Sequence, residues 1–115
     1  MENRWKYVPY INSIFPREQY HFRNEKEKLI DPKKIISLSR PFEEIYTPEI
    51  EGLRKQILEQ GYKRRNLVCL YEDLEGNYYV GRNGNHRAIL TYELGIPEIP
   101  ALVRKIRKKD SSIGR

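Results

Sequence analysis

The spacing of apolar residues predicts a helix near the middle of the chain. Three apolar residues recur at intervals of three and four positions: Ile50, Leu53 and Ile57. This spacing places them on one face of a helix. Thr47 is typical of an N-cap and Pro48 of the first helical position, and Gly61 is typical of the residue that ends a helix. The pattern therefore predicts a helix from residue 48 to residue 60.

Short apolar runs on either side of this helix predict strands at residues 35–38, 67–71, 78–81 and 99–103. A second helix is predicted over residues 85–94, with Ala88, Ile89 and Tyr92 facing the core and Gly95 following its end. This order predicts a small α/β sheet fold. A glycine-containing turn precedes the second helix at the carboxyl end of a strand, where ligands of open α/β sheets commonly bind.

Composition narrows the class of protein. The chain has 115 residues, of which 38% are hydrophobic and 33% charged, so we expect one folded domain. It has no apolar run of membrane-spanning length and no apolar segment of a secretion signal at its start. The single cysteine excludes an internal disulfide and fits a reducing compartment, so we expect a cytoplasmic protein without a membrane partner. Without a Cys/His cluster, a structural zinc site is not expected.

The net charge of +6 is unevenly distributed. Residues 81–115 carry 8 basic and 3 acidic side chains, whereas residues 31–80 carry 8 and 9. A basic run lies near the end of the chain: Arg104, Lys105, Arg107, Lys108 and Lys109. Such a run can bind the nucleic-acid backbone, and it can equally be a solvated tail. DNA is therefore a candidate partner.

The residues with the clearest chemistry lie in the turn before the second helix, which reads Gly-Arg-Asn-Gly-Asn-His-Arg over residues 81–87. A helix start offers unpaired backbone N–H groups and a partial positive charge, and glycine lets a ligand approach the backbone. The turn therefore predicts a phosphate site formed by Gly84, Asn85, His86 and Arg87. The alternatives are an ion pair of Arg87 with Glu49 or Glu51, and a structural hydrogen bond for His86.

These residues resemble a known superfamily. The Gly-x-His-Arg turn, the Ile-Pro-Ala-x-Val strand at residues 99–103 and the Ile-Ser-Leu-Ser-Arg-Pro segment at residues 36–41 resemble the ParB/sulfiredoxin superfamily over residues 31–104. The resemblance implies a mixed sheet with two main helices and a C-terminal strand. It also implies ATP or CTP phosphates bound at the turn, with Arg87 as the principal side chain, Mg²⁺ as a candidate cofactor, and a DNA-linked role. Residues 1–30 then form an arm and residues 105–115 a basic tail.

At some positions this chain departs from the superfamily pattern, and these departures limit which of the superfamily's reactions we expect. Sulfiredoxins carry a catalytic cysteine where this chain has Asn85, so peroxiredoxin repair is not expected. ParB proteins carry Gly-Glu-Arg-Arg at this turn. The free serine kinase branch has an acid where this chain has Asn83. A kinase remains an alternative, with Glu49 as base and His86 orienting phosphate. A nucleic-acid binder without nucleotide chemistry is the third hypothesis.

The first 30 residues are rich in aromatic side chains: Trp5, Tyr7, Tyr10, Phe15, Tyr20 and Phe22. Their spacing fits neither a helix nor a strand. Such an arm can pack on its own domain, form a homodimer contact or stack on bases. The resemblance does not extend to this segment, so all three alternatives stay open.

Overall fold

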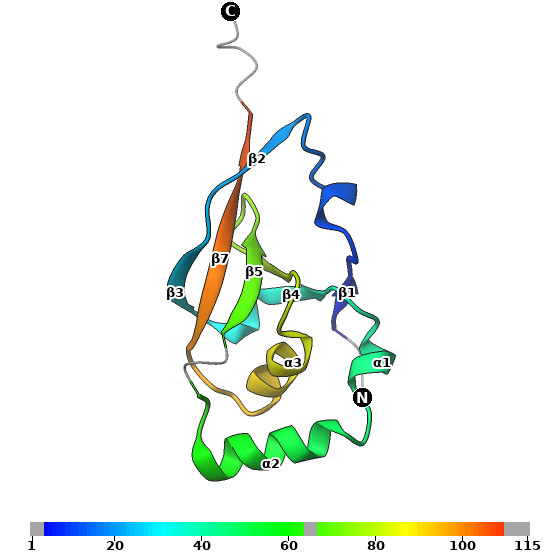
Figure 1. The fold of residues 1–115 in the computed structure, drawn as a ribbon, viewed down its shortest axis with the longest axis vertical. Helices are drawn as coiled ribbons and strands as arrows, with labels where there is room; N and C mark the ends of the chain where they lie inside the picture. The colour runs from blue at the N-terminus through cyan, green and yellow to red at the C-terminus, as the bar shows by residue number, and fades with distance from the viewer. Residues whose placement is uncertain (1–3, 64–66, 110–115) are drawn as a thin grey trace, which may run out of the picture.

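The computed structural model describes residues 4–63 and 67–109 (Figure 1). Its strands are β1 (Lys6–Tyr7), β2 (Tyr20–Phe22), β3 (Lys26–Ile30), β4 (Ile35–Leu38), β5 (Val68–Glu72), β6 (Tyr78–Val80) and β7 (Ile99–Lys108). The α-helices are α1 (Phe42–Ile45), α2 (Ile50–Gln60) and α3 (Asn85–Glu93), and short 3-10 helices lie at Ile11–Ser13 and Pro32–Lys34. The predicted mixed α/β fold is confirmed.

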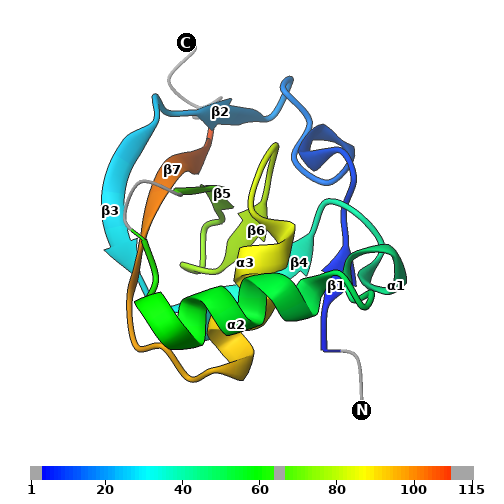
Figure 2. The ribbon, with the colours of Figure 1, turned by 60° about the horizontal axis from the view of Figure 1, so that its bottom comes forward.

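The strands of the described residues form one mixed sheet in the order β1-β4-β6-β5-β7-β2, with β3 also paired to β7. β5 pairs antiparallel with β6 and parallel with β7, while β4 is parallel to both β1 and β6. In Figure 1 α3 lies between the sheet and α2, and in Figure 2 α2 crosses in front of α3. The turn from β6 to α3 is thus held between a central strand and the helical layer.

The core lies between the sheet and the helices. Fully buried side chains from the sheet and from α3 meet there: Ile35, Leu38, Val68, Ala88, Leu90 and Ile99. The predicted apolar face of α2 is confirmed, because Ile50 and Ile57 are buried and Leu53 packs against them. Tyr92 differs from the prediction. It is 38% exposed, since it lies on the outer side of α3, where its ring meets that of Trp5 edge to face.

The start of α2 also differs from the prediction. The helix begins at Ile50, with Glu49 at the N-cap and without a side-chain cap. Thr47 and Pro48 form a turn, and their carbonyls accept the N–H groups of Ile50 and Glu51 at 2.9 and 3.1 Å. These backbone bonds satisfy donors that the Thr47 hydroxyl would otherwise cap, so Thr47 and Pro48 lie outside the helix.

The aromatic N-terminal segment packs on its own domain. β1 pairs with β4, and β2 and β3 pair with β7, so residues before 30 extend the sheet. The ring of Phe15 lies 5.8 Å from that of Tyr79, and the ring of Phe22 lies 5.6 Å from that of Tyr71. Packing of the arm against its own domain is therefore observed, whereas a homodimer contact and base stacking stay predictions.

β7 is longer than predicted, because it continues beyond Val103 to Lys108. Most of the basic run is thus part of a strand, paired with β5 on one side and with β2 and β3 on the other. The remainder of the predicted tail, residues 110–115, lies outside the described residues. In the ranges that the structure describes, no helix has the length and apolar character needed to cross a membrane.

Candidate functional site

The turn between β6 and α3 is fixed by its backbone. The N–H of Gly81 donates to the carbonyl of Cys69 at 2.8 Å, and the N–H of Cys69 donates to the carbonyl of Asn83 at 2.9 Å. Gly84 has a φ of +122°, and an added Cβ would lie 2.7 Å from the Cβ of Val68. Only glycine fits this position, because both the backbone angle and the contact with β5 exclude a side chain.

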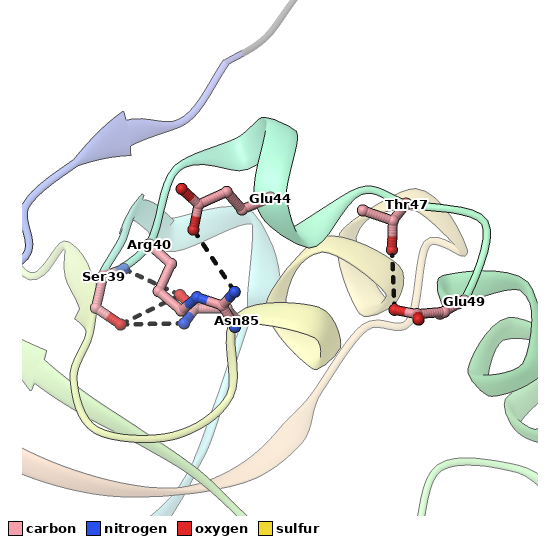
Figure 3. Close-up of polar contacts among 6 residues, drawn as sticks. All are labelled: Ser39, Arg40, Glu44, Thr47, Glu49 and Asn85. Atoms are coloured by element: carbon pink, nitrogen blue, oxygen red, sulfur yellow. Dashed lines mark hydrogen bonds and ion pairs between the residues drawn. The ribbon is translucent and has the colours of Figure 1, made fainter.

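Asn85 connects this turn to the end of β4 (Figure 3). Its Oδ1 accepts from the backbone N–H of Ser39 at 2.9 Å, and its Nδ2 donates to the Ser39 hydroxyl at 3.0 Å. That hydroxyl donates in turn to the carbonyl of Gly81 at 2.7 Å. Both polar atoms of the Asn85 side-chain amide are therefore already hydrogen-bonded to Ser39. The group that Asn85 can offer to a phosphate is its backbone N–H, at the first position of α3.

His86 and Arg87 lie in the first turn of α3 and are half-buried. Burial lowers the pKa of His86, the cations of Arg40 and Arg87 lower it further, and Glu49 opposes them. Arg40 and Arg87 thus act on the same imidazole from two different elements. The surroundings of His86 are therefore electropositive, and they favour the neutral form of its imidazole.

The guanidinium of Arg87 makes no hydrogen bond or ion pair with any residue that the structure describes. The predicted alternative, a pair with Glu49 or Glu51, is not observed. Glu51 pairs with Arg54, and Glu49 lies 3.4 Å from the Thr47 hydroxyl. Arg87 lines a small hollow beside Tyr62, whose pKa burial raises to about 12. Among the residues with described positions, Arg87 therefore has no acidic partner.

A larger cavity of about 460 Å³ lies on the other side of the turn. Its lining combines residues 8–12 of the N-terminal segment with Ser39, Arg40, Gly81, Arg82 and Asn85. Arg40 pairs there with Glu44 at 3.6 Å, and both side chains are more than half exposed, so an anion could displace this contact (Figure 3). Arg82 pairs with Glu25 at 2.6 Å.

Glu49, the predicted base of a kinase, is exposed at the N-cap of α2. Its effect on the pKa of His86 places it within electrostatic reach of the site. Among residues 4–63 and 67–109, no group of three or more His, Cys, Asp or Glu side chains could hold a metal ion. A Mg²⁺ ion held mainly by nucleotide phosphates needs no such cluster, so the predicted Mg²⁺ stays a prediction.

β7 separates the basic run into two groups, because alternate residues of a strand face opposite sides of the sheet. Arg104 donates to the backbone carbonyls of Arg23 and Phe22 at 2.8 and 3.3 Å, and its guanidinium lies 5.9 Å from the Phe22 ring. Lys105 and Arg107 point to the other face, into a separate groove. Lys108 and Lys109 are exposed at the end of the strand. The five predicted residues thus do not form one site.

The sequence assigned no role to Ser39, and it left Arg40 open between a cation of the same cleft and a surface residue. It left Tyr10 open among the three alternatives for the aromatic arm. Arg40 follows β4, whose end meets the start of α3 only through the parallel pairing of β4 with β6. Tyr10 is brought to the cavity by the N-terminal segment after it pairs with β4. Neither contact follows from local sequence, because the segments are far apart along the chain.

Neither the family models nor the curated proteins compared with this sequence include a match. A solved structure of a Pnob8-like ParB-N domain, in its C2221 form, matches with a TM-score of 0.52 and 18% sequence identity. The match covers 83% of this chain and 34% of that chain, so this chain spans about a third of the length of that structure. The order and arrangement of its helices and strands give this chain a ParB-N-like fold.

Proposed function

We propose that this chain is a nucleotide-binding domain that holds the phosphates of ATP or CTP at the start of α3. One observation carries the proposal. Within the described part of the chain Arg87 has no acidic partner, Arg40 has only an exposed one, and both cations lie close enough to lower the pKa of His86 at that helix end. Uncompensated cations beside a helix N-terminus favour an anion with several oxygens.

Each group has a distinct part in this site. The backbone N–H groups of residues 85–87 donate to phosphate oxygens, and Gly84 lets the turn that presents them pack closely against Val68. Arg87 and Arg40 neutralise phosphate charge from two sides, and Arg is suited to this because its planar fork meets two oxygens at once. His86 gains a proton as phosphate charge offsets its two cationic neighbours.

The cavity beside the turn supplies space for the rest of a nucleotide. It opens between Gly81 and the N-terminal segment, and Tyr10, which is 75% exposed, lies in its wall. An exposed ring at this position is a surface on which a base can stack. The ParB-N-like fold and the net positive charge further support a DNA-linked setting for this nucleotide binding.

A kinase reaction has no comparable support. Glu49 is exposed, and its printed contact is with the Thr47 hydroxyl. Without a described carboxylate cluster, we assign no metal-dependent step to the protein. Turnover that depends on Glu49 therefore stays a prediction, tested by phosphate release from Glu49→Gln in the presence of magnesium.

The test is thermal unfolding of the wild type with ATP, CTP, GTP, ADP and AMP, with and without magnesium. A nucleotide at about 100 times its Kd should stabilise the protein by about 2.7 kcal/mol. Arg87→Ala should abolish the shift while its unfolding without nucleotide stays unchanged. Lys55→Ala, which removes an exposed cation of α2, is the matched control and should keep the shift. A wild type that no nucleotide stabilises contradicts the proposal.

A further inference from the structure

A groove of about 290 Å³ lies on the sheet, away from the turn that begins α3. Five cations and one carboxylate line it: Arg23, Lys26, Lys28, Lys105, Arg107 and Glu72. We refer to these residues as the basic groove. Its lining shares no residue with the cavity beside the turn.

Strand pairing assembles the basic groove from distant parts of the chain. In the register of the sheet, Lys26 lies opposite Val103, and Glu72 lies opposite Lys105. Val103, Lys105 and Arg107 alternate along β7 and so share one face, with neighbours about 7 Å apart at two residues per repeat. β3 adds a second row on the same face. Two rows of cations therefore follow adjacent strands.

The charges of the basic groove are not balanced. Glu72 is buried, and it contacts Lys28 at 3.2 Å and Lys105 at 3.9 Å. Among the residues that the structure describes, the side chains of Arg23, Lys26 and Arg107 have no hydrogen bond or ion pair. All three are exposed. An excess of unpaired, exposed cations in a concave surface attracts a polyanion.

We propose that the basic groove binds the phosphate backbone of a nucleic-acid duplex without reading its sequence. Rows of exposed Lys and Arg on paired strands match a chain of phosphates that recurs at short, regular intervals. No aromatic side chain of residues 4–63 or 67–109 lines the groove, so these residues give it no stacking surface of the kind by which proteins bind single strands. It is a second site, and its binding does not depend on nucleotide.

The experiment measures fluorescence anisotropy of a labelled duplex of about 20 base pairs between 50 and 200 mM salt. The variant R23A/K26A/R107A removes the three unpaired cations. The control K33A/K34A/K55A removes three exposed cations from outside the groove, with the same change in net charge. Melting curves of both variants establish that they are folded. If the triple groove variant does not fold, the single exchange Arg107→Glu takes its place.

The groove variant should bind the duplex at least tenfold more weakly at 50 mM salt. Its slope of log affinity against log salt should fall by up to about 2.7, because each lost phosphate contact removes about 0.9. The control should keep wild-type affinity. Equal losses in the groove and control variants would overturn the proposal. So would a wild type that does not bind, tighter binding of a single strand of equal length, or equal displacement of the duplex by polyglutamate.

Discussion

Both polar atoms of the Asn85 side-chain amide hydrogen-bond to Ser39. The amide oxygen accepts from the backbone N–H of Ser39 at 2.9 Å, and the amide nitrogen donates to the Ser39 hydroxyl at 3.0 Å. A backbone N–H can only donate, so this pairing fixes which way the amide faces. The two contacts join the end of β4 to the first residue of α3. They hold Arg40 beside His86, although the two residues come from separate parts of the chain.

Asn85→Ala should lower the free energy of unfolding by about 1–3 kcal/mol, because it leaves the half-buried N–H of Ser39 unpaired. Urea denaturation measures the change. Asn83→Ala is the control, since Asn83 is exposed and makes one long contact, of 3.3 Å, with the carbonyl of Leu67. It should change stability by about 0.5 kcal/mol or less. Equal effects of both exchanges would show that the Ser39 contact is not the stabilising one.

Two glycine-to-alanine exchanges should change the free energy of unfolding in opposite directions. Gly84→Ala forces a side chain into a φ of +122° and against Val68. We expect it to cost about 1–2 kcal/mol for the backbone and a further amount of about 1–3 kcal/mol for the contact. Gly52→Ala, in α2 with open space around its Cβ position, should instead stabilise by about 0.5–1 kcal/mol.

Equilibrium unfolding in urea compares the two alanine variants with the wild type. Destabilisation by Gly52→Ala, or tolerance of Gly84→Ala, would contradict the close approach of the turn to β5.

His86 should make stability depend on pH. Burial, followed by Arg40 and Arg87, lowers its pKa in the folded protein below the ordinary value of 6.5. The unfolded chain then binds a proton more readily, so the free energy of unfolding falls as pH drops through about 6.5 and below. Above that pH the effect is absent. Urea unfolding of the wild type and His86→Gln between pH 5 and 8 measures it.

In His86→Gln the loss of stability at low pH should be smaller than in the wild type. His21→Gln, which changes an exposed histidine of β2, should follow the wild-type curve. Identical pH profiles for wild type and His86→Gln would show that His86 is not the group that makes stability depend on pH.

Tyr10 should contribute to nucleotide affinity through stacking. If a base lies in the cavity beside the turn, Tyr10→Ala should weaken binding by about 1–3 kcal/mol, and Tyr10→Phe should retain it. Tyr7→Ala is the control, because Tyr7 is 54% exposed but does not line that cavity. Titration calorimetry with the nucleotide that stabilises the wild type distinguishes them. Similar affinities for the two alanine variants would place the base elsewhere.

Local sequence determined much of the fold. The spacing of Ile50, Leu53 and Ile57 specified α2, and the apolar runs specified β4, β5 and β6, because periodicity reports which side chains can be buried together. The Gly-x-His-Arg turn likewise identified the start of α3, since glycine and helix-start chemistry depend on neighbouring residues.

Tertiary structure decided what these elements bring together. Through strand pairing, β7 continues into the basic run, so Arg104 and Lys105 lie on opposite faces of the sheet. The same pairing places Lys26 opposite Val103. The pairing of β1 with β4 also places the N-terminal segment near the turn. The end of β4 likewise lies where Ser39 can hydrogen-bond to the side-chain amide of Asn85. The sequence could not reveal these contacts, because pairing partners are chosen by the packing of distant segments rather than by any local pattern.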